Sequence, residues 1–236
     1  MTRIRLITLD LDNTLWNVDS TIRRAEASLR AWLGEHAPAA LQIYAETDLT
    51  EFRQRAVEHA PDKRHDLSYL RVFVLTEVCV AAGYSASEAS TIAENAFAVF
   101  FEGRNQVDFY TGAKEMLATL SQDYPLLALT NGNANVDRVG IGQYFQGAIC
   151  SADVGASKPD AEMFNAALKY GDCNAVDAVH VGDNLIDDIQ GAKAVGMHTI
   201  WVNLTAQERR HDEPMADIEI KHLNDMPAAV AELNNR

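Results

Sequence analysis

Cysteine is scarce in this chain: the 236 residues contain three, Cys79, Cys150 and Cys173. Their number is odd and no two of them have the C-x-x-C spacing. The sequence therefore predicts neither a disulfide framework nor a zinc site. Such cysteine usage is typical of a reducing compartment, and we expect a cytoplasmic protein.

Long hydrophobic runs are also lacking. The longest mostly apolar stretch, VFVLTEVCVAA at residues 72–82, is too short to span a bilayer and contains Glu77. The first residues show no charged segment followed by an apolar segment and a cleavage site. These two absences predict a protein without a membrane partner.

Positive charge is in the minority, with 20 Lys and Arg against 34 Asp and Glu and a net charge of −14. This charge repels a phosphate backbone, so nucleic acid is not an expected partner. The hydrophobic content of 47% is ordinary for a globular protein with a sizeable core. The length suits one large domain or two modest ones.

Two aspartates follow a short apolar run in the stretch LITLDLDNTLW, residues 6–16. The run is typical of a buried strand, and side chains two positions apart on a strand point to the same face. Asp10 and Asp12 would therefore raise each other's pKa unless a cation were present. The pair favours a site for a hard divalent ion over an exposed turn.

Residues 17–107 have helical patterns. Apolar residues at helical spacing predict helices at 20–36, 49–59, 65–84 and 85–101. Capping signals are expected at three places: a capping box of Asp48 with Glu51, a second of Ser85 with Glu88, and a C-terminal glycine, Gly83.

Strand patterns alternate with helix patterns from residue 108 onward. This alternation indicates a parallel sheet covered by helices on both faces. The predicted fold class is α/β, with a Rossmann-like parallel sheet core formed by residues 1–16 and 108–236. Residues 17–107 would form an all-helical domain inserted after the first strand.

Polar residues follow three of the predicted strands: Asp10 after the first, Thr130 and Asn131 after PLLAL, and Asp183 after AVHVG. Ligands of open parallel sheets bind beyond the carboxyl ends of the strands. We therefore expect these side chains to meet at one edge of the sheet. The helical insertion begins at the same edge and is placed to act as a lid.

These residue types suit phosphoryl transfer. Mg²⁺ binds one or two carboxylates together with waters and phosphate oxygens, and a nearby carboxylate can attack phosphorus to form an aspartyl-phosphate. Lys158, in SKP ahead of a helix, would supply a positive charge, and Thr130 would donate to phosphate oxygens. Asp183, with Asp187 or Asp188, would supply the remaining acid for the ion.

Four motifs together resemble those of the haloacid dehalogenase superfamily of phosphohydrolases. They are DLDNT (10–14), TNGN (130–133), SKP (157–159) and GDNLIDDIQGA (182–192), in the family's order. The helical insertion between the first two is similar to the family's type C1 cap. Asp12 implies a phosphatase, because haloacid dehalogenases proper lack an acid there and need no magnesium.

The resemblance implies a role for each matched residue. Asp10 would be the nucleophile, and Asp12 the general acid and base. Thr130 and Asn131 would bind the phosphoryl group, and Lys158 would hold it beside the nucleophile.

The resemblance also implies a Mg²⁺ site. The Asp10 carboxylate, the Asp12 backbone carbonyl and Asp183 would hold the ion. The further acid aligns best as Asp188, with the adjacent Asp187 as the alternative. Asn184 stands where many relatives have Asp or Ser.

The expected substrate is a small phosphorylated metabolite. TNGNA, SKPDAEMF and HVGDN resemble bacterial phosphatases acting on flavin mononucleotide (FMN) or on 5-amino-6-(5-phospho-D-ribitylamino)uracil of riboflavin biosynthesis. Phosphoglycolate and N-acylneuraminate 9-phosphate phosphatases share the four motifs and stay as alternatives. A phosphomutase and a non-catalytic regulator are the remaining ones.

Three residues of the insertion, His65, Arg71 and Arg104, are candidates for substrate binding, although residues of this kind are more often solvent-facing helix residues than ligands. His180, between two valines, is predicted to be a hydrogen-bonded core histidine, and Trp16 is predicted to pack at the hinge. The oligomeric state is left open between monomer and homodimer.

Overall fold

The structure is a computed structural model in which residues 4–235 are described. It divides into two compact units: the described chain up to Asn17 together with the chain from Asp108, and residues 18–107. The predicted first boundary lies one residue earlier, and the ends of the predicted core, residues 1–3 and 236, lie outside the described residues. The role of the second unit as a cap stays a prediction.

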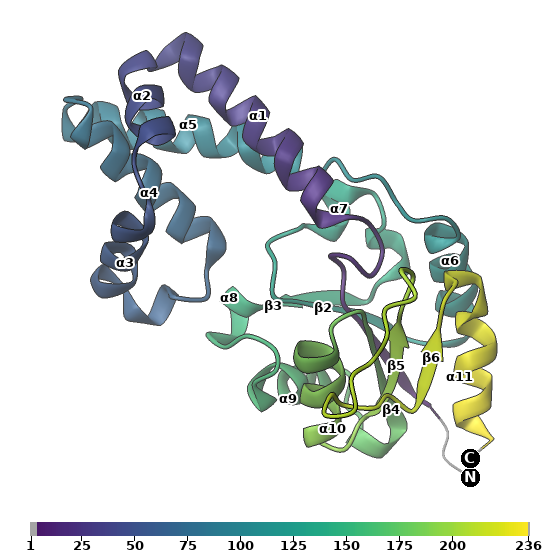
Figure 1. Cartoon of the computed structure of the whole chain (residues 1–236). Coiled ribbons are helices and arrows are strands. Elements are labelled where there is room, and N and C mark those ends of the chain that lie inside the picture. Colours follow the sequence, from purple (N-terminus) through teal and green to yellow (C-terminus); the bar gives the residue numbers. More distant parts are fainter. Residues whose placement is uncertain (1–3, 236) are drawn as a thin grey trace. The chain divides into compact units, whose positions relative to one another are not determined.

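The first unit contains one parallel sheet of six strands (Figure 1). The strands are β1 (Leu6–Leu9), β2 (Leu126–Thr130), β3 (Gly147–Cys150), β4 (Ala178–Gly182), β5 (His198–Val202) and β6 (Ile218–Ile220). Their order is β3-β2-β1-β4-β5-β6, and every neighbouring pair is parallel. The predicted α/β fold class is confirmed.

The strand order reverses at β1, which lies between β2 and β4. Ile7 is in register with Leu126 on one side and with Val179 on the other. In open parallel sheets such a reversal opens a crevice at the carboxyl ends of the strands, where ligands bind. The ends of β1, β2 and β4 are therefore the place where a site is expected.

Helices cover both faces of this sheet (Figure 1). The helical elements are α6 (Ala113–Asp123), α7 (Val136–Val139), α8 (Ser151–Val154), α9 (Ala161–Tyr170), η4 (Leu185–Gln190), α10 (Gly191–Ala194) and α11 (Met226–Asn234). On one face, Phe164 of α9 and Ala192 of α10 pack with Leu127 and Leu129 of β2. All five strand residues of β2 and of β4 are buried, as expected of a sheet covered on both sides.

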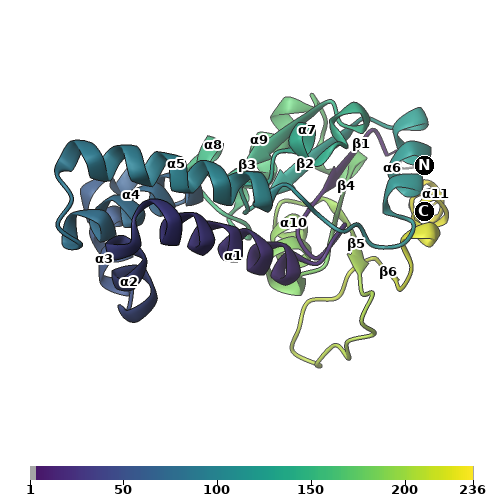
Figure 2. The same ribbon diagram turned by 90° about the horizontal axis from the view of Figure 1, so that it is seen from above.

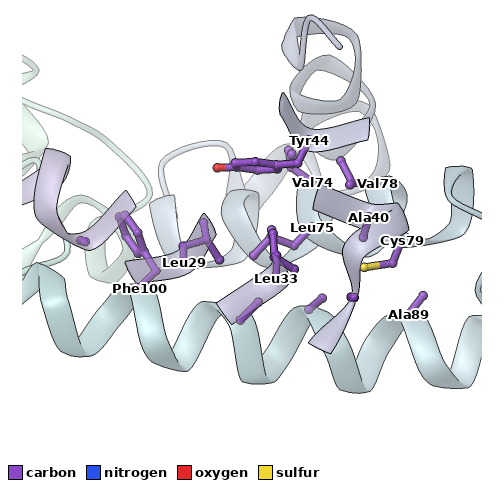
Figure 3. Packing of buried hydrophobic residues seen from close by; sticks show 14 residues of the cluster. Leu29, Leu33, Ala40, Tyr44, Val74, Leu75, Val78, Cys79, Ala89 and Phe100 are labelled. Atoms are coloured by element: carbon purple, nitrogen blue, oxygen red, sulfur yellow. The ribbon is translucent and has the colours of Figure 1, made fainter. Parts of the chain in front are cut away.

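The second unit is a bundle of five helices. They are α1 (Val18–His36), α2 (Pro38–Glu46), α3 (Thr50–His59), α4 (Leu67–Ala81) and α5 (Ala86–Arg104). Leu29 and Leu33 of α1 pack with Leu75 of α4 and Phe100 of α5 in a core of its own (Figure 3). The sequence analysis predicted no helix at α2, which begins at a proline after α1 ends.

The predicted caps have mixed outcomes. Ser85 and Glu88 form the expected capping box, and Gly83, with φ of 92°, ends α4 in the left-handed conformation. The box of Asp48 with Glu51 is wrong, because Asp48 instead accepts from the backbone N–H of Thr50 (3.0 Å). The predicted helix 65–84 is shorter, because an aspartate at position 66 caps it and it ends before the glycine.

No helix within residues 4–235 is both long and apolar enough to cross a bilayer. The longest connection in the first unit is the loop between β5 and β6, which extends away from the sheet (Figure 2). Lys193 of α10 anchors its far end by donating to Met215 O (2.7 Å) and pairing with Asp217 (3.1 Å).

Candidate active site

Asp10 stands at the carboxyl end of the central strand. Its backbone N–H donates to Val181 O (2.9 Å), and the residue is 7% exposed. After one tight turn, the Thr14 hydroxyl lies 3.2 Å from Asp10 Oδ2 and 3.1 Å from Asp183 Oδ1. Asn13 in this turn has φ of 60°, a value that asparagine tolerates better than most residues. The turn thereby joins the ends of β1 and β4.

Lys158 is buried between two carboxylates. Its Nζ lies 2.6 Å from Asp10 Oδ1 and 2.6 Å from Asp188 Oδ1. Of the two acids that the sequence leaves open, Asp188 makes this contact, while Asp187 lines the pocket formed by these groups. One ammonium therefore bridges two acids, Asp10 directly after β1 and Asp188 in the helical turn that follows β4.

Asn131 holds the backbone of Lys158. The Asn131 side-chain oxygen accepts from the Lys158 N–H (2.7 Å), and its side-chain nitrogen donates to the Lys158 carbonyl (2.9 Å). Ser151 in turn donates to the Asn131 carbonyl (3.0 Å). These bonds link the segments after β2 and β3 to the loop before α9. In this structure the Asn131 side chain fixes the backbone of Lys158.

Asp188 comes from η4, a turn of π-helix, in which the backbone N–H of Ile189 reaches Asn184 O, five residues before it. Such turns carry one extra residue and are frequent at functional sites. Asp188 Oδ2 accepts from the Asn184 N–H (2.9 Å), and the Asn184 side chain caps the turn by accepting from Ile186 and Asp187. Gly182 leaves room for the Asp188 carboxylate, which a Cβ at that position would overlap.

These groups surround a pocket of about 160 Å³. Its lining residues are Asp10, Asp12, Asn13, Thr130, Asn131, Gly132, Lys158, Asp183, Asn184, Asp187 and Asp188. The lining comes from the ends of β1, β2 and β4, as the strand-end argument predicts, and from η4 and the loop before α9. Every predicted site residue of the first unit is among them.

Burial and neighbouring charges shift the pKa values of the acids in this pocket. Burial, with Asp188 and Asp183 nearby, raises the pKa of Asp10 to about 8, although Lys158 opposes the shift. Burial and Asp188 likewise raise the pKa of Asp183 to about 7. Burial acts on Asp188 too, but Lys158 and the bond from His180 hold its pKa below the usual range. The pocket therefore favours a bound cation.

One oxygen each of Asp10, Asp183 and Asp188 lies within 4.8 Å of the others. An all-oxygen carboxylate set suits a hard divalent ion such as Mg²⁺. Asp188 and Asp10 both accept from Lys158, and the Asn184 N–H donates to the second oxygen of Asp188, so Asp183 has the freer oxygens. Coordination by the Asp12 carbonyl stays a prediction.

Asp12 lies on the pocket lining, and the indole Nε1–H of Trp16 donates to Asp12 Oδ1 (2.8 Å). Trp16 is fully buried and makes an edge-to-face contact with Phe109 (ring centroids 5.7 Å apart). The predicted packing role of Trp16 is confirmed. The hydrogen bond to Asp12 is an addition that the sequence did not show.

Two of the three candidates of the second unit, Arg71 and His65, have local partners there. Arg71 pairs with Glu26 (3.0 Å) and stacks over Phe100. His65 accepts from Arg64 Nε (2.8 Å). Arg104 is 2% exposed, so the alternative of a solvent-facing residue is wrong for it. Substrate contact by these three residues stays a prediction.

Sequence reasoning identified His180 as a core histidine but not its place beside the site. His180 is fully buried, its Nδ1 lies 2.7 Å from the Thr8 hydroxyl, and its Nε2 lies 3.1 Å from Asp188 Oδ1. The prediction of a hydrogen-bonded core histidine is confirmed. Thr8 and Ser151 received no role from the sequence, since a lone hydroxyl carries no spacing signal, and Thr14 received none although it lies in the motif DLDNT.

Comparisons with known proteins relate this chain to named phosphatases. The chain is 33% identical over 200 residues to 5-amino-6-(5-phospho-D-ribitylamino)uracil phosphatase of Escherichia coli, covering 85% of this chain and 84% of that protein. It is 32% identical over 206 residues to glyceraldehyde 3-phosphate phosphatase of Pyrococcus abyssi, covering 84% and 81%.

A solved structure of a protein named 2-haloacid dehalogenase, from Pseudomonas syringae, is 39% identical and covers 97% of this chain and 99% of that one, with a TM-score of 0.90. The family model for haloacid dehalogenase-like hydrolases matches residues 4–196. This match spans the first four strands, the helical insertion and all four motifs. The chain therefore belongs to the haloacid dehalogenase-like hydrolases.

Proposed function

We propose that the protein is a Mg²⁺-dependent phosphomonoester hydrolase that acts through a phosphorylated Asp10. The observation that carries the proposal is the position of Asp10, which is buried at a strand end and paired with Lys158 at 2.6 Å. A carboxylate nucleophile needs an electrophile that tolerates negative charge around it. A phosphoryl group beside an ammonium and a divalent cation meets this need.

In the first half of the reaction, an Asp10 oxygen attacks phosphorus. The bond between phosphorus and the ester oxygen breaks, and the leaving oxygen takes a proton from Asp12. Thr130 and the backbone after it hold the phosphoryl oxygens, and Lys158 neutralises the charge beside the nucleophile. The products of this half are the free alcohol and the Asp10 acyl-phosphate.

In the second half, Asp12 accepts a proton from water, and the water oxygen attacks phosphorus. The bond between phosphorus and the Asp10 oxygen breaks, which releases inorganic phosphate and returns Asp10 as a carboxylate. Both halves require Asp12 close to the reacting oxygen. Its place on the pocket lining and its bond from Trp16 suit this requirement.

Bound Mg²⁺ would supply charge neutralisation between Asp10, Asp183 and the phosphoryl oxygens. The raised pKa values of Asp10 and Asp183 support this assignment, because two carboxylates that repel each other are stabilised by a cation between them. Asp188 would act chiefly by holding Lys158.

For the substrate, we propose 5-amino-6-(5-phospho-D-ribitylamino)uracil or FMN. The support is the Escherichia coli relative, whose name gives the pyrimidine as its substrate, at 33% identity. The Pyrococcus abyssi relative, at 32% identity, is named for glyceraldehyde 3-phosphate, which makes that compound a necessary competitor. Phosphoglycolate and N-acylneuraminate 9-phosphate are the other compounds to be compared as substrates.

Hydrolysis of a 2-haloacid is the second candidate, favoured by the name of the similar Pseudomonas syringae protein. It needs a carboxylate nucleophile but no acid two residues later and no metal. Asp12 and the cluster of Asp10, Asp183 and Asp188 would then have no role. The site chemistry therefore favours phosphoester hydrolysis.

The test is phosphate release from each of these phosphate esters with Mg²⁺, beside halide release from 2-chloropropionate. We expect phosphate release that Asp10→Asn abolishes, no halide, and the pyrimidine or FMN leading by kcat/KM. Halide release that survives Asp12→Asn would overturn the proposal in favour of the dehalogenase. A higher kcat/KM for another phosphate ester would overturn the substrate proposal and leave the proposed reaction in place.

A further inference from the structure

A buried row of hydrogen bonds leads from Thr8 to the proposed active site. Thr8 on β1 and His180 on β4 are both fully buried and are in register with each other across the sheet. The proposed reaction uses neither residue. We propose that His180, oriented by Thr8, is a positioning residue that holds Asp188 against Lys158; this inference rests on the proposed function.

The direction of each hydrogen bond follows from the donors available. Asp188 Oδ1 lies 2.6 Å from the Lys158 ammonium and 3.1 Å from His180 Nε2. An ionised carboxylate only accepts, so Nε2 must carry a hydrogen. The Thr8 hydroxyl lies 2.7 Å from Nδ1 and 3.4 Å from the Val179 carbonyl. Nδ1 is therefore the better acceptor for this hydroxyl, and the imidazole is the Nε2–H tautomer.

The ring itself cannot turn away from this arrangement. Phe164 of α9 packs edge-to-face on His180, with ring centroids 5.2 Å apart, and both side chains are fully buried. Rotating the imidazole would leave Nε2–H without its acceptor in the core, which is unfavourable. His180 is thus a rigid donor at a fixed point.

That fixed point determines where the Lys158 ammonium lies. Lysine has a flexible stem and no directional preference of its own, so its carboxylate partners set its position. Asp188 Oδ1 is held by His180, and Asp188 Oδ2 is held by the Asn184 N–H (2.9 Å). With both oxygens held, Asp188 presents Oδ1 to Lys158 at the distance that also serves Asp10.

Two amide variants separate this role from simple packing. In His180→Gln the side-chain nitrogen can occupy the place of Nε2 and donate to Asp188. In His180→Asn the amide reaches only the place of Nδ1, near Thr8. Both variants bury one polar amide in the same cavity, so we expect similar losses in Tm. Only Asn removes the donor to Asp188.

We expect kcat of His180→Gln to stay within a few-fold of the wild type and kcat of His180→Asn to fall about 10–100-fold, the range for residues that support metal-site ligands. Activities are compared per folded protein at a temperature below both transitions. Equal kcat values for the two variants would overturn the inference, because a packing role does not distinguish the two amides. Thr8→Ser, which keeps the hydroxyl, should exceed Thr8→Val in kcat.

The tautomer gives a readout that needs no turnover. Ring ¹⁵N chemical shifts of histidine-labelled wild-type protein distinguish Nε2–H from Nδ1–H, and the signals missing in His180→Gln identify His180. We expect the Nε2–H form, and the Nδ1–H form would overturn the inference. A wild-type protein that hydrolyses no phosphate ester would overturn the proposed function and the positioning role together, while the ring shifts would still report the hydrogen-bond order.

Discussion

The indole Nε1–H of Trp16 donates a hydrogen bond of 2.8 Å to the Asp12 carboxylate. The four-residue separation brings the indole back to the motif that contains the proposed acid and base. Because the ring is fully buried against Phe109, its N–H is a fixed donor. Trp16 therefore sets the orientation of Asp12 as well as packing beside it.

Trp16→Phe should lower kcat about tenfold, since a hydrogen bond to a charged group contributes about 1.5–3 kcal/mol and about 1.4 kcal/mol corresponds to tenfold. The phenyl ring loses the donor and leaves part of the buried indole volume empty, so Tm should fall as well and kcat is compared per folded protein. Steady-state kinetics beside Trp32→Phe, a tryptophan of the helical unit, provides the comparison. An unchanged kcat in Trp16→Phe would show that the bond does not serve Asp12.

Asn131→Ala should lower kcat more than it raises KM. The Asn131 side chain holds the Lys158 backbone through two hydrogen bonds, of 2.7 and 2.9 Å, so its loss displaces the proposed phosphate-binding ammonium. We expect a fall in kcat of about tenfold or more, by analogy with other residues that support ligands at a distance.

The opposite pattern for Asn131→Ala, a raised KM with kcat unchanged, would indicate direct and uniform substrate binding instead. Ser151→Ala is the matched control, because it removes one bond to the Asn131 carbonyl (3.0 Å) and leaves the Lys158 contacts in place. Its effect on kcat should be smaller than that of Asn131→Ala.

Mg²⁺ should stabilise the protein more at pH 8 than at pH 6. The pKa of Asp10 is raised to about 8 and that of Asp183 to about 7, so both hold protons at pH 6 in the metal-free protein. Metal ligands must lose these protons, and apparent Mg²⁺ affinity therefore rises with pH through this window. Thermal unfolding with and without Mg²⁺ at the two pH values measures the effect.

The same two pKa values also predict how the stability of the metal-free protein changes with pH. A raised pKa means that the folded state binds more protons than the unfolded state between pH 4 and 8, so Asp10 and Asp183 make the metal-free protein less stable as pH rises. Asp183→Asn should lose most of the Mg²⁺ stabilisation at pH 8. A shift in Tm with Mg²⁺ that is equal at both pH values, or larger at pH 6, would contradict the assignment.

Gly182→Ala should lower kcat strongly while lowering the stability of the fold only moderately. A Cβ at position 182 overlaps the Asp188 carboxylate and pushes it from Lys158. Gly171→Ala is the control, because its Cβ would meet Leu6 Cδ2 at 2.7 Å, in the apolar core away from the pocket. Both should cost about 1–3 kcal/mol of stability. A similar kcat per folded protein in the two variants would refute the role of Gly182.

The sequence predicted the sheet and the meeting of its strand ends because these depend on regular patterns. Alternating strands and helices imply a parallel sheet, and polar residues directly after strands must lie at its carboxyl edge. Asp10, Thr130 and Asp183 were placed together by this argument alone, and the structure places all three on one pocket. The second helix of the insertion was not predicted; it has only nine residues and begins at a proline.

The supporting contacts could not be predicted, because they join residues far apart in the chain that have no shared spacing. Thr8 and His180 are separated by 172 positions, and Asn131 and Lys158 by 27. The choice between Asp187 and Asp188 depends on the π-helical turn of η4, whose extra residue changes which acid faces Lys158. The predicted capping box of Asp48 with Glu51 was wrong, because the Asp48 carboxylate accepts two hydrogen bonds from Thr50, the first residue of α3.

The central claim is that Asp10 carries the phosphoryl group, and trapping this intermediate tests it most directly. In Asp12→Asn the second half of the reaction is slow, while p-nitrophenyl phosphate needs no proton for its leaving group. Acid quenching with Mg²⁺ and this substrate, followed by peptide mass spectrometry, should show one added phosphoryl group on the peptide containing Asp10. No modified peptide, or the same modification in a protein that also carries Asp10→Asn, would contradict the account.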